Sequence, residues 1–421
     1  MSGSDPRRPG ASSGAAAPPA APTQPLAGVR VLAVEQYGAG PFGTSYLADL
    51  GAQVVKIENH HDGGDIGRHV GPHFFGPADS HFFETFNRNK QSLTLDLKHP
   101  DGIATLHRLV RGADALLENL RGDVADRLGL TYGTLKAHNP AIVCVHLSAY
   151  GRDGERRAWP GYDYLMQAEA GHMMMTGEPD GPPVRYGLSI VDYFTGLAAA
   201  FGLLAGVIQA RTTGVGADVE TSLFDVALHN LAYPATWVLN GAPAAPRTER
   251  GAHPSLVPSQ LCRTRDGWLF VMCNKEKFWA ELARALGHPE WATDPTLSSF
   301  AARLANRARV TLLLDEALMT RDTSDWLARL AGKVPVAPVH DLEQALRNPF
   351  VGARGNLRDF SHPDGRSARM IANPVRFAAI EPPLVAAPRM GEHNRTLLRE
   401  AGLDDAAIDR LAALGVIAPD P

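Results

Sequence analysis

Up to about residue 150, short apolar runs alternate with stretches whose apolar positions have helical spacing. Strand-like runs cover 28–35, 51–58 and 141–147, and helical patterns cover 42–50 and 100–110. Parallel strands need a crossover helix to bring the chain back to the same end of the sheet, so this alternation is typical of a parallel sheet. The pattern predicts an α/β fold whose large domain holds a Rossmann-like, doubly wound parallel sheet.

An uncharged, strongly apolar stretch, 193–209, begins directly after Asp192. It is shorter than the ~20 residues that span a bilayer. Its glycines, among them Gly202 and Gly206, permit close packing, so we expect a buried core helix. An Asp at the start of a helix is often a cap. A poorly hydrated Asp beside the positive end of a helix dipole also suits a carboxylate nucleophile, and both interpretations stay open here.

Changes in composition divide the chain. Residues 1–25 are rich in Ala, Pro, Ser and Gly and have no apolar core, so we expect a disordered tail and no secretory signal. We assign 26–215 to the first part of the large domain. A linker and a smaller α+β domain are expected over 216–335, and 336–421 is expected to return to the large domain.

The overall charge gives no reason to expect an extended anionic partner. The chain has 421 residues, a formal net charge of -4 and three widely separated cysteines. These values favour neither nucleic acid nor a membrane surface as a partner. The cysteine spacing implies neither a disulfide framework nor a zinc site, which is consistent with a reducing, cytoplasmic setting.

Cationic residues gather around the predicted loops of the sheet. Each alone is typical of a solvated surface charge, but ligands of doubly wound sheets bind at the carboxyl ends of the strands, so the group favours a phosphate-bearing ligand. Its members are Lys56, Arg68, Arg88, Lys90, Lys98, Arg121 and Arg127.

Two other classes of site have little support. The turn 38–41 has only two correctly spaced glycines and is no dinucleotide fingerprint. His60 and His61 are adjacent, and adjacent histidines rarely ligate one ion together, so we expect no metal.

Several short motifs follow one another in a fixed order over most of the chain. They include Ala39-Gly40-Pro41, Asn87-Arg88-Asn89-Lys90, Leu95-Asp96-Leu97-Lys98, Glu118-Asn119-Leu120-Arg121, Asp192 with Gly196, and Gly391-Glu392-His393. From about 26 to 417 this order resembles the class III CoA-transferases, of the formyl-CoA and carnitine-CoA transferase type. The resemblance implies a homodimer of two interlocked rings, with coenzyme A between the large domain of one subunit and the small domain of the other.

The resemblance also assigns residues. Asp192 matches the catalytic Asp, and Tyr162 and Asp163 match a motif that lines the acyl site. Coenzyme A or acyl-CoA is then a substrate, and no permanently bound cofactor is expected. The positions that match coenzyme A contacts are Tyr37, Gly38, Ala39, Leu95, Lys98, Asn119, Leu120 and Arg127.

The expected activity is transfer of CoA from an acyl-CoA to a free acid through an aspartyl anhydride and an aspartyl-CoA thioester on Asp192. Arg185, with Arg247, Arg250 and His253, favours a short dicarboxylate acceptor, and succinyl-CoA is the donor that we expect. One alternative is a 2-methylacyl-CoA racemase, which Tyr162 disfavours because those enzymes place a His there. The other alternative is a non-catalytic CoA-binding protein.

Overall fold

The computed structural model describes residues 24–365, 367–378 and 380–419. The expected disordered tail therefore lies almost entirely outside the described residues. A six-stranded parallel sheet has the order β5-β2-β1-β6-β7-β8, the doubly wound order in which the direction of winding reverses between β1 and β6. Its strands are β1 (Arg30–Val34), β2 (Gln53–Glu58), β5 (Gln91–Thr94), β6 (Ala115–Glu118), β7 (Val143–Ser148) and β8 (Ala217–Ser222).

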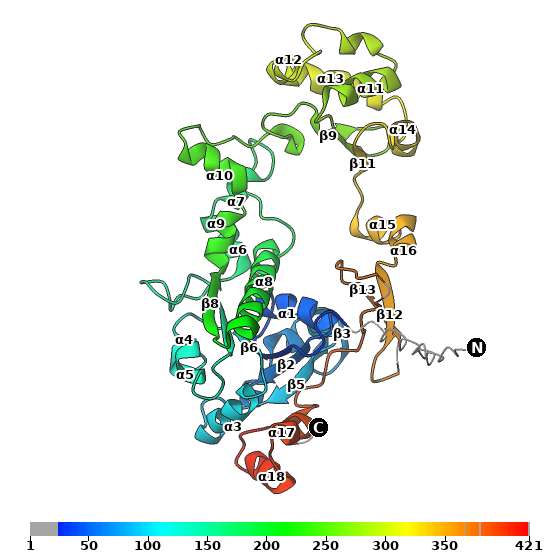
Figure 1. The fold of residues 1–421 in the computed structure, drawn as a ribbon. Helices are drawn as coiled ribbons and strands as arrows, with labels where there is room; N and C mark the ends of the chain where they lie inside the picture. Colours follow the sequence, from blue (N-terminus) through cyan, green and yellow to red (C-terminus); the bar gives the residue numbers. More distant parts are fainter. Residues whose placement is uncertain (1–23, 366, 379, 420–421) are drawn as a thin grey trace, which may run out of the picture.

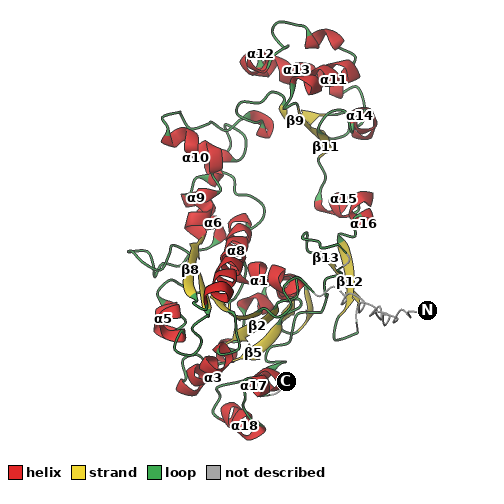
Figure 2. Ribbon diagram, viewed as in Figure 1, coloured by secondary structure: helices red, strands yellow, loops and turns green. Residues whose placement is uncertain are grey.

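Helices cover both faces of the sheet, because alternate residues of each buried strand point to opposite faces. Val31 and Ala33 of β1 pack with α1 (Ala39–Asp49) and α8 (Ile190–Thr213). Leu32, between them, packs on the other face. That face is covered by α3 (Pro100–Val110), α17 (Asn394–Glu400) and α18 (Asp405–Ala413). The parallel α/β sheet predicted from the sequence is confirmed (Figure 2).

Two glycines bring α1 and α8 into backbone contact. A Cβ on Gly43 of α1 would lie 2.2 Å from the carbonyl oxygen of Gly196, and a Cβ on Gly196 would lie 2.3 Å from that of Ala39. No side chain fits at either position, so the helices cross closely. This crossing sets the N-terminal end of α8 beside that of α1.

The uncharged stretch forms a longer helix than predicted. α8 has 24 residues and, by length and composition alone, is long and apolar enough to cross a membrane. Half of its most apolar window is buried inside the protein, against the sheet and α1. The prediction of a core helix therefore holds for one side of α8, whereas Phe201 and Ile208 on its other side are exposed.

A second unit has its own core and an antiparallel sheet, with the strand order β11-β10-β9. Trp279, Leu282, Leu314 and Trp326 are among its buried residues. Its elements are β9 (Ser259–Arg263), β10 (Trp268–Met272), α11 (Glu276–Leu286), α12 (Phe300–Ala305), α13 (Arg307–Leu318), α14 (Thr323–Leu330) and β11 (Val336–Pro338).

Two separate legs of chain connect the units, on opposite sides of the molecule (Figure 1). α9 (Leu223–His229) and α10 (Ala232–Leu239) form the outgoing leg. The returning leg holds α15 (Leu342–Leu346), α16 (Pro349–Ala353), β12 (Leu357–Ser361) and β13 (Ser367–Ile371). β8 falls in the range 216–335, expected to hold the linker and small domain, but it pairs with β7 and is the edge strand of the large sheet.

The remaining elements are short and lie in the connections of the large sheet. They are β3 (Phe74–Gly76), β4 (Asp79–Ser80), α2 (His81–Asn87), α4 (Val124–Leu128), α5 (Tyr132–Leu135), α6 (Asp163–Glu169) and α7 (His172–Met175).

Candidate active site

Two adjoining hollows lie at the carboxyl edge of the large sheet, where its winding reverses. The Asp192 hollow has a volume of about 380 Å³ and takes its walls from the ends of β1, β6 and β7 and from α8. The Lys98 hollow, of about 240 Å³, lies between the ends of β1, β2 and β5. Gln36, Leu120 and Val124 line both, so the two form one groove across the switch point.

Asp192 is the third residue of α8 and is only 7 % exposed. Its carboxylate faces Gly38, where a Cβ would lie 2.7 Å from Asp192 Oδ2. Within the described part of the chain, no hydrogen bond reaches this carboxylate. A buried carboxylate without donors is held in a reactive state, since donors would otherwise stabilise its negative charge.

The N-terminus of α8 is capped by Asp163 and not by Asp192. Asp163 Oδ2 accepts the backbone N–H groups of Val191, at 2.6 Å, and of Asp192, at 3.0 Å. Its Oδ1 accepts the Gln167 amide at 2.6 Å. Asp163 is therefore the cap of α8 from 29 residues upstream, and the Asp192 side chain is left to face the hollow.

Burial and, as a smaller contribution, the negative charge of Asp163 together raise the pKa of Asp192 to about 7. Asp192 is thus a carboxyl group that titrates near neutral pH. Such a group is a carboxylate in most molecules only above that pH.

The N-terminal end of α1 also faces Asp192. Gly38 is its N-cap, and the first helical bond runs from Phe42 N–H to the Gly38 carbonyl. In the described residues the N–H groups of Ala39 and Gly40 have no partner, and Pro41 has no N–H. Free N–H groups at a helix N-terminus bind anions, so this end of α1 provides donors beside the carboxylate.

The turn before α1 is held by a buried ion pair. Tyr37 has a left-handed backbone, with φ 65°, and donates its N–H to Asp65 Oδ1 at 2.8 Å. Asp65 Oδ2 lies 2.7 Å from Lys56 Nζ, and both side chains are fully buried. A non-glycine residue in this conformation needs support from its surroundings, and Asp65 supplies it.

Asn119 closes the crevice between β1 and β6. Its Oδ1 accepts the Gln36 N–H at 2.9 Å and its Nδ2 donates to the Gln36 carbonyl at 2.8 Å. Glu118 supports the next residue, since its Oε2 accepts the Leu120 N–H at 2.7 Å. These bonds fix the wall that both hollows share.

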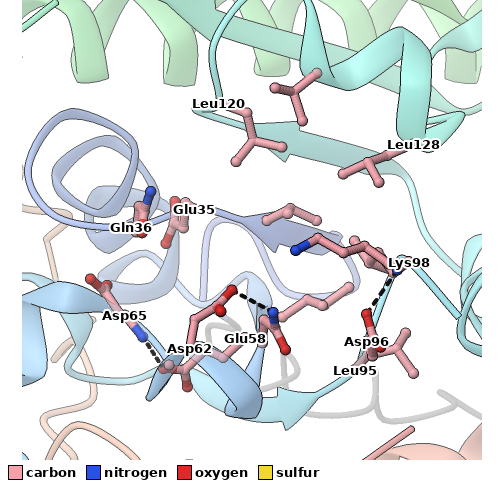
Figure 3. A pocket seen from close by; sticks show the side chains of 16 residues that line it. Glu35, Gln36, Glu58, Asp62, Asp65, Leu95, Asp96, Lys98, Leu120 and Leu128 are labelled. Atoms are coloured by element: carbon pink, nitrogen blue, oxygen red, sulfur yellow. Dashed lines mark hydrogen bonds between the residues drawn. The ribbon is translucent and has the colours of Figure 1, made fainter. Parts of the chain in front are cut away.

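The Lys98 hollow combines apolar walls with one cation. Leu95, Leu120 and Leu128 form apolar parts of its wall, and the exposed Lys98 extends its side chain into it (Figure 3). An apolar slot with a cation at its rim suits a flat ring system that carries phosphates.

Comparison with known proteins identifies the family. A profile of CoA-transferase family III matches residues 26–394. This chain belongs to CoA-transferase family III. It is therefore an enzyme of the class III CoA-transferases, whose substrates are CoA thioesters, and the resemblance drawn from the sequence motifs is confirmed.

Curated relatives cover nearly the whole of this class III CoA-transferase. The succinate–glutarate CoA-transferase of Agrobacterium fabrum is 32% identical over 386 residues, which are 89% of this chain and 95% of the relative. The succinyl-CoA:mesaconate CoA-transferase of Haloarcula hispanica is 32% identical over 385 residues, 89% of this chain and 96% of the relative. A crystal structure of a CAIB/BAIF family protein from Brucella suis has a TM-score of 0.78 at 32% identity and covers 90% of this chain and 99% of that one.

Most predicted contact residues of the transferase lie in the groove. Tyr37, Gly38, Ala39, Asn119, Leu120 and Tyr162 line the Asp192 hollow, and Leu95 and Lys98 line the Lys98 hollow. Arg127 lines neither among the described residues, and its guanidinium pairs with Asp123 at 3.2 Å. Asp163, the first residue of α6, does not line the hollow; it is buried and contacts the start of α8.

Four of the seven cations expected near a phosphate are instead buried in the large domain. Each is within 2.7 Å of a carboxylate oxygen, which removes it from contact with a ligand: Lys56 with Asp65, Arg68 with Glu58, Arg88 with Asp49, and Lys90 with Glu35. The prediction that they form a phosphate-binding group is wrong, because their partners neutralise them.

The four residues expected near a second carboxylate differ in whether other groups of the protein already bind them. Arg247 donates to three backbone carbonyls, and Arg250 pairs with Asp315 at 2.5 Å. The His253 ring accepts backbone N–H groups at Nδ1 and contacts the Tyr233 hydroxyl at Nε2. Arg185 is exposed, lies 4.3 Å over the Tyr164 ring and has no carboxylate partner among the described residues.

Proposed function

We propose that this class III CoA-transferase moves CoA from succinyl-CoA to a short dicarboxylic acid, with Asp192 as the covalent nucleophile. The observation that carries the proposal is the Asp192 carboxylate itself. It is buried, accepts no hydrogen bond from the described residues, and lies against Gly38 at the N-terminal end of α1, in the groove that the two hollows form.

In the first half-reaction, CoA moves from the donor acid to the carboxyl group of Asp192. An Asp192 oxygen attacks the thioester carbonyl, a C–O bond forms, and the C–S bond breaks to give an aspartyl acyl anhydride and CoA thiolate. The thiolate then attacks the aspartyl carbonyl of the anhydride. This step forms an aspartyl-CoA thioester and releases the donor carboxylate, with the electron pair of the broken C–O bond.

The second half-reaction repeats these steps with the acceptor. The acceptor carboxylate attacks the aspartyl thioester and displaces CoA thiolate, which gives a second mixed anhydride. The thiolate attacks the acceptor carbonyl, forms the new acyl-CoA and restores the Asp192 carboxylate. Each carboxylate that attacks must be ionised. No step requires a proton transfer or an external reductant.

Each attack develops a negative oxygen, and the free N–H groups of Ala39 and Gly40 are the donors beside it. The α1–α8 crossing at Gly43 and Gly196 keeps these donors at a fixed distance from Asp192. Because the donors are part of a helix, they do not have to reorganise when charge develops.

Two observations support a dicarboxylate acceptor. The curated relatives include enzymes named for succinate, glutarate and mesaconate, which are dicarboxylates. Arg185 lies over Tyr164, two residues after Tyr162 of the Asp192 hollow, and suits a carboxylate at the far end of a short acid. Lys98 is the matching cation for the CoA phosphates at the other end of the groove.

We propose further that two copies interlock as rings and act in the cytoplasm. α8 carries an outward apolar stripe with seven-residue spacing, in which Phe201 is 76% and Ile208 67% exposed. Leu239 of α10 is 83% exposed. Exposed apolar rows of this kind are typical of a protein interface. The chain runs between the two units by two separate legs (Figure 1), as a ring-shaped subunit requires. Light scattering tests the dimer, and a fully active monomer contradicts it.

The function is tested by incubating the enzyme with succinyl-CoA and a panel of mono- and dicarboxylic acids, and by identifying new acyl-CoAs by mass spectrometry. We expect products with short dicarboxylates, loss of turnover in Asp192→Asn, and unchanged turnover in the exposed control Asp325→Asn. Turnover in Asp192→Asn contradicts the mechanism. Products with monocarboxylates alone contradict the acceptor class but not the nucleophile.

A further inference from the structure

A second cluster of ligating side chains lies outside the groove, where the returning leg meets the large domain. Asp79 Oδ2 from β4, Glu84 Oε1 from α2 and His362 Nε2 from the turn after β12 lie within 4.8 Å of one another. His362 Nε2 is 2.8 Å from Asp79 Oδ2 and 3.5 Å from Glu84 Oε1. None of the three lines either hollow of the active site.

Glu84 is the member that points to a ligand. Its side chain is fully buried, with an exposed fraction of 0%. Its Oε2 accepts the Ala387 N–H at 3.0 Å, whereas its Oε1 has no hydrogen-bond partner and faces the other two side chains. A buried carboxylate oxygen without a donor is costly, and a bound cation removes that cost.

Contacts at Nδ1 and on the face of the ring hold His362 in position. Its Nδ1 lies 3.0 Å from Asp364 Oδ1, and its ring stacks on Phe75 with centroids 5.0 Å apart. The Asp364 backbone N–H also donates to Nδ1 at 3.4 Å, so this edge of the ring is held within its own turn. Here Nε2 faces the two carboxylates.

The cluster opens on a hollow of its own. Asp79 and His362 line a space of about 370 Å³ that also contacts Arg68 and Arg389. Water from this space has access to the cluster, so that ligands not supplied by side chains are available. The nearby arginines belong to the same hollow and do not pair with Glu84 Oε1.

We propose that Asp79, Glu84 and His362 bind a divalent first-row transition-metal ion such as Zn²⁺, with water completing its coordination. Tetrahedral zinc with bonds of about 2.0–2.1 Å separates its ligand atoms by about 3.3 Å, and the two measured separations of 2.8 and 3.5 Å bracket that value. The ion ties the returning leg to α2, away from the reacting atoms.

The test uses the untagged full-length enzyme, stripped with EDTA and titrated with ZnCl₂ by calorimetry. We expect one Zn²⁺ per chain, a rise in Tm on binding, and at least tenfold weaker binding in both Glu84→Gln and His362→Gln. His288→Gln, in the exposed His288–Glu290 pair, is the matched control and leaves the affinity unchanged.

Failure to saturate at one ion per chain overturns the proposal, and so does binding that both Glu84→Gln and His362→Gln leave intact. If those variants do not fold, crystals of the wild-type enzyme soaked in ZnCl₂ decide the matter. An anomalous peak between the three side chains supports the site, and a peak only elsewhere overturns it.

Discussion

Asp163 accepts the backbone N–H of Asp192 at 3.0 Å, so one carboxylate caps the helix that presents the other. The cap has two consequences for Asp192. It fixes the first turn of α8, and its negative charge raises the pKa of Asp192, in addition to the larger effect of burial. The two consequences are separable, because one depends on a hydrogen-bond acceptor and the other on charge.

Asp163→Asn keeps one acceptor oxygen and removes the charge, whereas Asp163→Ala removes both. We expect Asp163→Asn to move the acid limb of kcat/KM to lower pH, because the pKa of Asp192 falls. Asp163→Ala should also lower the free energy of unfolding by about 1–2 kcal/mol through loss of the cap. pH–rate profiles and urea denaturation measure these effects, and equal stability of Asp163→Ala and the wild type contradicts the capping role.

The raised pKa of Asp192 predicts how activity depends on pH. The nucleophile must be a carboxylate, so kcat/KM should rise with pH through an apparent pKa near 7. A profile that stays flat down to pH 5 contradicts this expectation.

The raised pKa of Asp192 also predicts how the free energy of unfolding changes with pH. Between pH 4 and 7 the folded state holds a proton on Asp192 that the unfolded state has released, so Asp192 makes the wild type less stable as the pH rises through this window. Asp192→Asn removes the effect. The variant should gain up to about 4 kcal/mol over the wild type at pH 8 and little at pH 4. Chemical denaturation at the two pH values measures the difference, and an equal difference at both contradicts the raised pKa.

The helix crossing should tolerate no side chain. Gly196→Ala places a Cβ 2.3 Å from the Ala39 carbonyl oxygen, so α1 must move away. We expect a loss of about 3 kcal/mol in stability and a fall in kcat of tenfold or more, since the donors of α1 move with the helix. Gly352→Ala in α16 is the matched control, because open space surrounds Gly352, and it should be neutral or stabilising. Equal stability of the two variants excludes a tight crossing.

Lys98 should contribute to acyl-CoA binding more than to chemistry. Lys98→Ala is expected to raise the KM for succinyl-CoA about fivefold to tenfold with little change in kcat, which corresponds to one exposed charge-assisted contact. Added salt should reduce the difference. Lys136→Ala, at the end of α5, is the control with unchanged kinetics, and an unchanged KM in Lys98→Ala contradicts the assignment.

The central strands and the position of Asp192 were predictable because both leave local patterns. Buried parallel strands are continuous apolar runs, as in β1 and β7. β8 was missed because Asp218 and Glu220 interrupt it, as is common in an edge strand. Asp218 lies 2.8 Å from the buried His146, an interaction that only the folded chain reveals.

The errors at the site have one physical origin, which is pairing between residues far apart in sequence. Arg88 pairs with Asp49 and Lys90 with Glu35, across 39 and 55 residues. A cation with a distant partner has the same local sequence as a cation that awaits a phosphate. The role of Asp163 as the cap of α8 was hidden for the same reason, whereas the motif that contains it was visible.

The most direct test of the account is chemical trapping at Asp192. The enzyme is incubated with succinyl-CoA without an acceptor, quenched with hydroxylamine, digested and analysed by mass spectrometry. An acyl anhydride or CoA thioester on the side chain is converted to a hydroxamate, so we predict this modification on the peptide that contains Asp192, dependent on succinyl-CoA. Full transferase activity with no modification of Asp192, or with the modification on another carboxylate, contradicts the proposed mechanism.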